Sequence, residues 1–307
     1  MTRVWAIVLN TFREAVRDRI LHGVIGLACG VLIFTLALGQ LSLDQEQRVV
    51  EDIGLAATSF FSVVVAIFLG SSLLYKEIER KTLYVILPKP IRRWQFLVGK
   101  FGGIVLTALV FILLMGGILL LVMALQRGAS AALVGGVVFG LPILLAALWK
   151  KLPDPTAATL PFALVFVGAA LAIAGSVQVD VMLIARSLLL DLGEVAVLSA
   201  VALFFSSFST PFLTGGFTFG IWLVGRSAQS MAEMRSELLA DEVKTVLHGL
   251  ARVVPNFDLF VPDRATLVAT EAGGPWLYVA ETMGYGALYC TALLVLASAV
   301  FARRDFV

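Results

Sequence analysis

The residues of this chain that are best suited to chemistry lie in one charged connection between two long apolar segments. It begins at Lys76-Glu77-Ile78-Glu79-Arg80-Lys81-Thr82 and runs through Pro88 to Gly99-Lys100. Loops rich in Lys and Arg remain on the cytoplasmic side of a membrane. We therefore place this connection in the cytoplasm, where it can contact a soluble partner. Its basic side chains are Lys76, Arg80, Lys81, Lys89, Arg92, Arg93 and Lys100.

The centre of this connection is compatible with a short helix. The run Glu77-Ile78-Glu79-Arg80-Lys81-Thr82-Leu83-Tyr84 contains no helix breaker, and it would have to end before Pro88. A rigid helix directly beneath two spans can convert a partner's movement into a tilt of both. The alternative is that the cluster only determines topology, but topology requires positive charge and not the interleaved carboxylates Glu77 and Glu79.

A second group of charges lies within an apolar stretch. Arg186, Asp191 and Glu194 fall within an arc of about 140° if their segment is one helix. Ionisable groups at membrane depth often mark a path for an ion or a substrate. Two other interpretations remain open: an Arg–carboxylate pair that neutralises itself, or a short interfacial helix with its charges among lipid headgroups.

The sequence offers little other chemistry. It contains only two histidines, and Gly99-Lys100 lacks the upstream glycine and the following hydroxyl of a phosphate-binding loop. Cys29 and Cys290 both lie in apolar runs and form no metal-binding motif. We expect no catalytic residue, bound cofactor or metal in this chain, and no nucleic-acid partner. Energy for active transport would come from an ion gradient or a separate subunit.

Composition assigns the chain to the membrane. It has 307 residues, of which 60% are hydrophobic and 14% charged. Soluble domains are about 45–50% apolar and 25% charged, so this protein is solvated mainly by lipid. A spanning helix needs about 20 mostly apolar residues. We expect an all-α polytopic membrane protein with six to eight transmembrane helices, and the candidate segments are 22–39, 54–75, 97–125, 131–149, 159–177, 181–225 and 275–301.

The stretch from Val181 to Gly225 is too long for one span, and we expect it to break near Ser206-Ser207-Phe208-Ser209-Thr210-Pro211. Eight spans would put both termini on the same side. With the N-terminus inside, 15 of the 23 Lys and Arg residues are cytoplasmic. This bias agrees with the positive-inside rule, and the orientation follows more firmly than the number of spans.

Two regions outside the spans carry helical patterns. Residues 1–21 predict an interfacial helix, because Trp5, Leu9, Phe12, Val16 and Ile20 recur at helical spacing. Residues 229–274 form the largest aqueous segment, in which we expect a helix over Ser230–Val254. This segment would shape the outer exit of a pathway or contact an extracytoplasmic partner.

The order of these features resembles the permease subunits of type-2 ABC exporters. An interfacial helix and two spans precede the pattern Glu-x-Glu-x-x-Thr-Leu, Pro-x-x-Arg and Gly-Lys, which this chain carries at Glu77, Glu79, Thr82, Leu83, Pro90, Arg93, Gly99 and Lys100. Three other stretches are similar to the branch involved in maturation of multicopper enzymes or nitrous-oxide reductase. They are Leu203–Ser209, Pro255–Phe260 and Phe301–Asp305.

The resemblance implies a single permease domain over residues 1–307 in a bacterial cytoplasmic membrane. It would pair with a second copy or paralogue, amid membrane lipid, and with ABC ATPase subunits that hold ATP and Mg. Residues 76–96 would form the coupling loop docked on the ATPase, and the residues implied are Glu77, Glu79, Arg80, Thr82, Leu83, Pro90, Arg93 and Lys100. Such permeases usually have six spans, so residues 131–177 resemble an inserted transmembrane hairpin.

The leading hypothesis is therefore a non-catalytic, membrane-spanning subunit of an ATP-driven exporter. The alternative is an ion-gradient-driven transporter that uses Arg186, Asp191 and Glu194. A passive membrane scaffold is a third class, for which no charge reversal would affect transport. The sequence does not indicate the cargo, nor does it distinguish a homodimer from a heterodimer.

Overall fold

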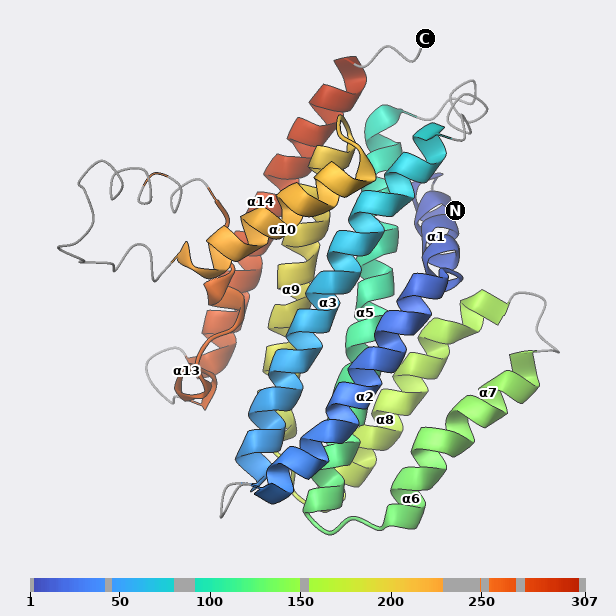
Figure 1. The fold of residues 1–307 in the computed structure, drawn as a ribbon, viewed down its shortest axis with the longest axis vertical. Helices are drawn as coiled ribbons and strands as arrows, with labels where there is room; N and C mark the ends of the chain where they lie inside the picture. The colour runs from blue at the N-terminus through green and yellow to red at the C-terminus, as the bar shows by residue number, and fades with distance from the viewer. Residues whose placement is uncertain are drawn as a thin grey trace. The chain divides into compact units, whose positions relative to one another are not determined.

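The computed structural model describes residues 3–41, 46–79, 92–149, 155–228, 249, 254–268 and 274–303 (Figure 1). Regular structure in these ranges is helical, which confirms the predicted all-α polytopic class. Within them, six helices are long and apolar enough to cross a membrane. These are α2 (Arg19–Leu41), α3 (Glu46–Glu79), α5 (Arg93–Gln126), α8 (Thr159–Ser176), α9 (Val181–Ser206) and α14 (Gly274–Arg303).

The remaining helices are shorter. They are α1 (Arg3–Val16), α6 (Ala131–Gly135), the π-helix η1 (Gly136–Gly140), α7 (Leu141–Trp149), η2 (Pro155–Ala158), α10 (Pro211–Arg226), η3 (Asp258–Phe260) and α13 (Arg264–Val268). Two segments expected to span, residues 131–149 and 211–225, fall in this group. The described residues thus give the lower end of the expected six to eight spans.

The predicted break between Val181 and Gly225 is confirmed. Helix α9 ends at Ser206, and α10 begins at Pro211. Proline suits the first turn of a helix because its missing N–H would have had no intrahelical partner there. Thr210 precedes it with an extended backbone, which directs the chain into a new helix.

The N-terminal helix is shorter than the expected interfacial element over residues 1–21. Helix α1 ends at Val16, and Asp18 then accepts the backbone N–H of Ile20 at 3.0 Å and starts α2. Ile20 therefore belongs to α2 and not to the stripe of α1. Within α1, Phe12 is buried, whereas Trp5 is half exposed.

The chain divides into two compact units that share four helices. Unit 1 contains residues 1–8, 66–105 and 193–307, and unit 2 contains residues 9–65 and 106–192. The division passes through α1, α3, α5 and α9, so each of these helices contributes one part to each unit.

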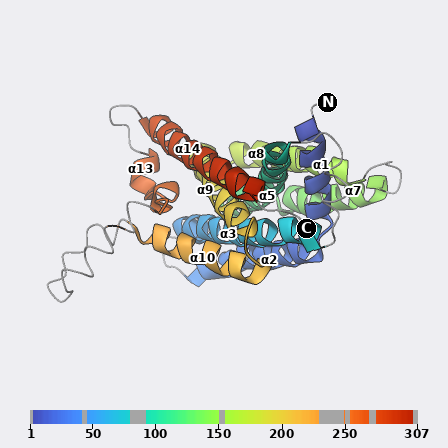
Figure 2. The same ribbon diagram turned by 90° about the horizontal axis from the view of Figure 1, so that it is seen from above.

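In unit 1, the second part of α9 packs closely against its neighbours. A Cβ atom placed on Gly70 of α3 would contact Ala202, and one on Gly193 would lie 2.7 Å from Met283 Sδ of α14. Phe205 of α9 contacts Phe217 of α10, with ring centroids 5.3 Å apart. Figure 2 shows α9 between α14 and α10 in this unit. Small residues allow this close approach of helix backbones.

Both ends of the described chain contact the start of α5 in unit 1. Gly99 and Gly102 of α5 face Ile7 and Val8 of α1 so closely that a Cβ at either glycine would press against them. Near the end of α14, Phe301 stacks on Phe96 with ring centroids 6.2 Å apart. The first turns of α5 therefore join α1 to α14.

Unit 2 is built around the second part of α5. Gly116 faces Leu188 of α9, Gly117 faces Phe166 of α8, and Leu119 fits against Gly54 of α3. Phe12, Val110 and Ala163 form a buried apolar cluster. Helix α5 thus carries apolar contacts to α1, α3, α8 and α9 within its unit.

Several expected features lie outside the described residues. They are the middle of the coupling loop (80–91), the turn of the expected hairpin (150–154), almost all of the expected helix Ser230–Val254, and the C-terminal residues 304–307.

Candidate functional site

The charged connection begins within helix α3. Helix α3 continues to Glu79, so Glu77 and Glu79 lie in its last turn. Arg80, Thr82, Leu83 and Pro90 fall outside the described residues. The structure therefore describes the two ends of the expected coupling loop, at α3 and at Arg93.

Arg93 fastens the start of α5 to the end of α14. Its Nη1 donates a hydrogen bond to the carbonyl oxygen of Phe301 at 3.0 Å. Carbonyls near a helix C-terminus lack intrahelical donors and carry partial negative charge, so a guanidinium suits that position. Beside it, Gln95 Oε1 accepts the backbone N–H of Arg92 at 3.1 Å, as in one half of a capping box.

Lys100 occupies an unusual position for a residue expected in ATPase coupling. It lies two turns into α5 and is only 1% exposed. Its Nζ lies 5.9 Å from the centroid of the Phe96 ring, within reach of a cation–π interaction. Its charge is not presented on the surface of this chain. A role in coupling stays a prediction, and it would act through packing at the start of α5.

A buried ion pair joins α9 to α10 in unit 1. Glu194 has no exposed side-chain area, and its Oε1 accepts hydrogen bonds from Arg226 Nη1 at 3.2 Å and Trp222 Nε1 at 2.9 Å. Trp222 and Arg226 are one turn apart on α10. Charge-assisted hydrogen bonds of this kind are stronger than neutral ones, and removal of one partner would leave a charge buried.

The same arginine also holds the segment that precedes η3. Arg226 Nη1 donates to the carbonyl oxygen of Phe257 at 3.3 Å, and the Phe257 N–H donates to Gly225 at 3.1 Å. From α14, Tyr285 accepts the Asn256 N–H at 2.8 Å, and Tyr278 donates to the Leu259 carbonyl at 2.7 Å. The stretch Pro255–Phe260 is thus tied to two helices, and Phe257 and Phe260 are buried.

The remaining intramembrane charges lie on the same helix as Glu194. The structure places Arg186, Asp191 and Glu194 on α9, which confirms the assumption of a single helix. Asp191 is buried and Arg186 is half-buried, and both belong to unit 2. Sequence reasoning missed Arg226 as a partner of Glu194. An arginine in the last turn of an otherwise apolar helix was the available signal.

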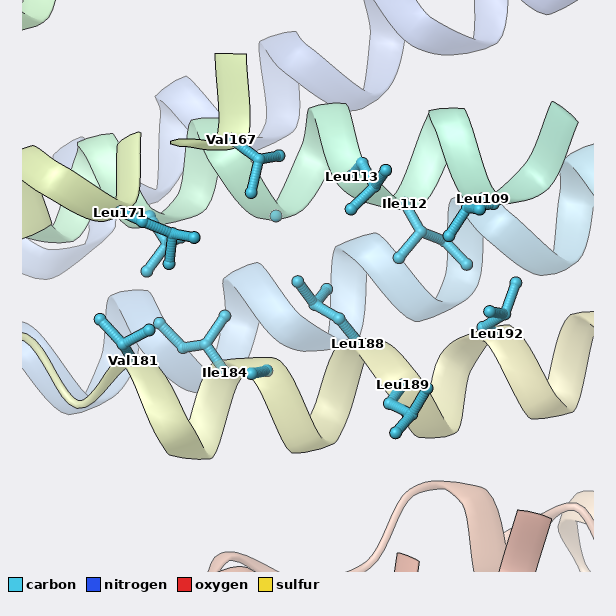
Figure 3. Close-up of a pocket in the computed structure, with 13 residues that line it drawn as sticks. Leu109, Ile112, Leu113, Val167, Leu171, Val181, Ile184, Leu188, Leu189 and Leu192 are labelled. Atoms are coloured by element: carbon cyan, nitrogen blue, oxygen red, sulfur yellow. The ribbon is translucent and has the colours of Figure 1, made fainter. Parts of the chain in front are cut away.

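Unit 2 contains an apolar cavity of about 220 Å³ (Figure 3). Its walls come from α5, α8 and the first part of α9, and its lining residues are all apolar. A second cavity of about 160 Å³ lies among α1, α2, α5, α7 and α8. Among the described residues, no group of three or more His, Cys, Asp or Glu side chains could hold a metal ion.

Comparison with protein families finds a match to the model described as ABC-2 family transporter protein, over residues 5–306. The chain belongs to the ABC-2 family of transporters. A comparison with curated proteins found no match. As an ABC-2 protein with several membrane-spanning helices, it is a multi-pass permease subunit of an ABC transporter.

The ABC-2 match extends over both units and includes the connection between α3 and α5. It assigns no role to individual residues. The coupling residues and the intramembrane charges of this ABC-2 permease therefore remain predictions, now accompanied by the contacts described above.

Proposed function

We propose that this ABC-2 permease is the non-catalytic, membrane-spanning subunit of an ATP-driven exporter. A separate cytoplasmic ABC ATPase would hold ATP and Mg, and its closure would act on residues 76–96. A second permease copy or paralogue would complete the transporter. The substrate pathway would then reorient as the spans tilt.

The observation that carries this proposal is that the helices on both sides of the connection, α3 and α5, make close contacts in unit 1. On one side, α3 packs against α9 at Gly70 and Ala202. On the other, Arg93 and Phe96 at the start of α5 contact Phe301 of α14. A push on the connection would therefore reach α9 and α14 through packed side chains and not through a loose linker.

The same contacts support a shared location for the two termini. Helix α1 and the last turns of α14 both pack on the start of α5, next to the connection rich in Lys and Arg. The positive-inside rule then favours a cytoplasmic location for the connection and for both termini. We propose that this membrane is the bacterial inner membrane, as the resemblance to type-2 ABC exporters implies.

The branch of the family to which the protein belongs is a separate part of the proposal. Pro255–Phe260, one of the stretches similar to the multicopper-enzyme and nitrous-oxide-reductase maturation branch, is a firmly held segment of unit 1. We propose membership of that branch. Residues 229–274 would then shape the outer exit or contact an extracytoplasmic partner.

The proposal is tested by charge reversal at the ends of the connection. The double variant Glu77→Arg with Arg93→Glu should lose the co-purifying ATPase and still insert in the membrane. Arg48→Glu is the matched control, because Arg48 is exposed at the opposite end of α3. If the double variant retains the ATPase in gentle detergent as well as the control does, the coupling role of this connection is wrong.

The gradient-driven alternative predicts a different result. The variant Asp191→Asn with Glu194→Gln should abolish transport if these carboxylates carry an ion, and only perturb it if they are structural. The hydrogen bonds of Glu194 to Trp222 and Arg226 favour a structural role for this carboxylate. Transport that persists in proteoliposomes without an ion gradient would exclude the alternative.

A further inference from the structure

The cavity of unit 2 has an apolar lining that suits a hydrocarbon ligand. Leu109, Ile112 and Leu188 face one another across it, and it extends to Leu171 and Val181 at one end (Figure 3). An engineered cavity of about 150 Å³ lined by Leu, Ile and Phe stays dry and binds small hydrocarbons. The larger cavity of this protein therefore favours a hydrocarbon ligand over water.

The cavity has the length of one lipid leaflet. Along α9 its lining runs from Val181 to Leu192, and at the rise of an α-helix this distance is about 16 Å. Half of a bilayer's hydrocarbon core is about 15 Å thick. Because α5, α8 and α9 are all long enough to span the membrane, a ligand along this wall would lie at acyl-chain depth.

One end of the cavity adjoins the turn between α8 and α9, and a cationic side chain from the end of α5 contacts this turn. The turn joins α8 to α9 just before Val181, and Gln178 adopts a left-handed backbone there with φ of 56°. Arg127, which follows the end of α5, donates a hydrogen bond to the carbonyl of Gln178. Asp180 caps α9 by accepting the Leu183 N–H at 3.2 Å. A guanidinium has five donors and binds phosphate well, so donors remain for a headgroup.

Two residues that line the cavity are also exposed, so a lipid could enter the cavity beside them. Leu171 and Ala185 both line the cavity, and both are exposed. A lipid acyl chain that enters between these two residues exchanges its contacts with neighbouring lipid tails for contacts with the cavity wall. The bound chain would lie in the leaflet on the side where α5 ends and α9 begins.

We propose that this cavity binds one acyl chain of a membrane phospholipid, with the lipid phosphate at Arg127. The bound acyl chain fills the cavity of unit 2 and stabilises the packing of α8 against α5 and α9. This inference depends on the membrane-spanning helices and not on the energy source of transport. It holds whether or not the proposed ATP-driven function is correct.

The test is photo-crosslinking in the full-length protein. The chain is reconstituted, without ATPase or cargo, into nanodiscs of phosphatidylethanolamine and phosphatidylglycerol that contain a phosphatidylglycerol with a diazirine on its acyl chain. Peptide mass spectrometry should find adducts enriched on the lining residues Leu109, Ile112, Leu188 and Leu192. Adducts no more frequent there than on the exposed Leu164 and Val165 of α8 would overturn the proposal.

Two variants sharpen the assignment. Ala185→Phe places a ring in the cavity and should lower labelling of the lining about tenfold, because exclusion of even a few methylene groups has an effect of that size. Ala172→Phe adds the same ring at an exposed position of α8 outside the lining and should leave labelling unchanged. Equal labelling in Ala185→Phe and wild type would contradict the proposal. If Ala185→Phe does not fold, the wild-type enrichment alone decides.

The headgroup is tested separately. Arg127→Gln should reduce labelling of the lining by the phosphatidylglycerol probe, and Arg127→Lys should restore most of it because the cation is kept. If Arg127→Gln labels as strongly as wild type, the phosphate is not bound at Arg127 and that part of the proposal fails.

Discussion

The two parts of helix α9 form opposite kinds of structure. In unit 1, Glu194 is held by two charge-assisted hydrogen bonds, and Gly193 brings Met283 and Phe260 into close contact. In unit 2, one face of α9, which includes Val181, Leu188 and Leu192, borders an apolar cavity of about 220 Å³ (Figure 3). One continuous helix thus combines a tightly specified part with an adaptable part.

The difference between the two parts of α9 suggests different roles for them when a transporter changes conformation. A part that is tightly packed and hydrogen-bonded transmits displacement, because close-packed interiors do not deform gradually. A part that borders an apolar cavity can repack at low cost, because few specific bonds must be broken. Unit 1 contains the contacts of Arg93 and Phe96 with Phe301 beside the charged connection, and it also contains the ion pair between Glu194 and Arg226.

The ion pair should give the largest effect. Arg226→Gln removes the cation that lies 3.2 Å from the fully buried Glu194 carboxylate, which should cost about 3–5 kcal/mol. Thermal unfolding in detergent would show a strongly lowered midpoint. The double variant Arg226→Gln with Glu194→Gln should recover most of the loss, because no uncompensated charge remains. Equal loss in the single and double variants would contradict a stabilising pair.

The two parts of α9 should also respond differently to loss of a leucine side chain. Leu198 is fully buried in unit 1, so Leu198→Ala should cost about 3–4 kcal/mol. Leu188 borders the cavity, so Leu188→Ala should cost about 2 kcal/mol, because the side chain already lacks some packing partners. Chemical unfolding of the two variants in parallel makes the comparison. A larger loss for Leu188→Ala would reverse the contrast.

The close approach at Gly225 should give a moderate effect. A Cβ atom there would meet the backbone carbonyl of Pro255, which cannot move aside easily. Gly225→Ala should therefore destabilise by about 1–3 kcal/mol. Gly220→Ala on the same helix has open space around the new methyl group and should be neutral or slightly stabilising. Indistinguishable melting curves for the two variants would show that the loop contact is unimportant.

Arg93 should affect stability least and coupling most. Arg93→Gln loses a charge-assisted bond that is only part-buried, so the change in stability should be about 1 kcal/mol. If the start of α5 passes movement to α14, the increase in the ATP hydrolysis rate of the partner ATPase that accompanies transport should be about tenfold smaller in Arg93→Gln. Arg48→Gln, at an exposed position, is the control. Unchanged stimulation in Arg93→Gln would exclude this contact from the coupling route.

Local features of the sequence were sufficient to predict the membrane class and most helices. Hydropathy identified the long spans, and Pro211 marked the break after α9, because both signals act within one segment. The extent of the N-terminal helix was less predictable. The apolar period continues to Ile20, but the cap at Asp18 starts a new helix before it.

The parts that depend on helix packing could not be read from the sequence. The partner of Glu194 is Arg226, on a different helix, and periodicity within one segment does not indicate which helices meet. Lys100 belongs to a motif expected to touch a soluble partner, yet its side chain is only 1% exposed and lies beside Phe96 of the same helix. The cavity of unit 2 arises from a mismatch of side chains on three helices, which no local pattern predicts.

The most direct test of the proposed function is to purify the protein from its native host in gentle detergent and to identify by mass spectrometry what co-elutes. We expect a stoichiometric soluble protein with a phosphate-binding loop, lost in the variant Glu77→Arg with Arg93→Glu. If the permease elutes without any ATPase and its reconstituted vesicles show ion-dependent flux, an ATP-driven function is wrong and transport is driven by an ion gradient.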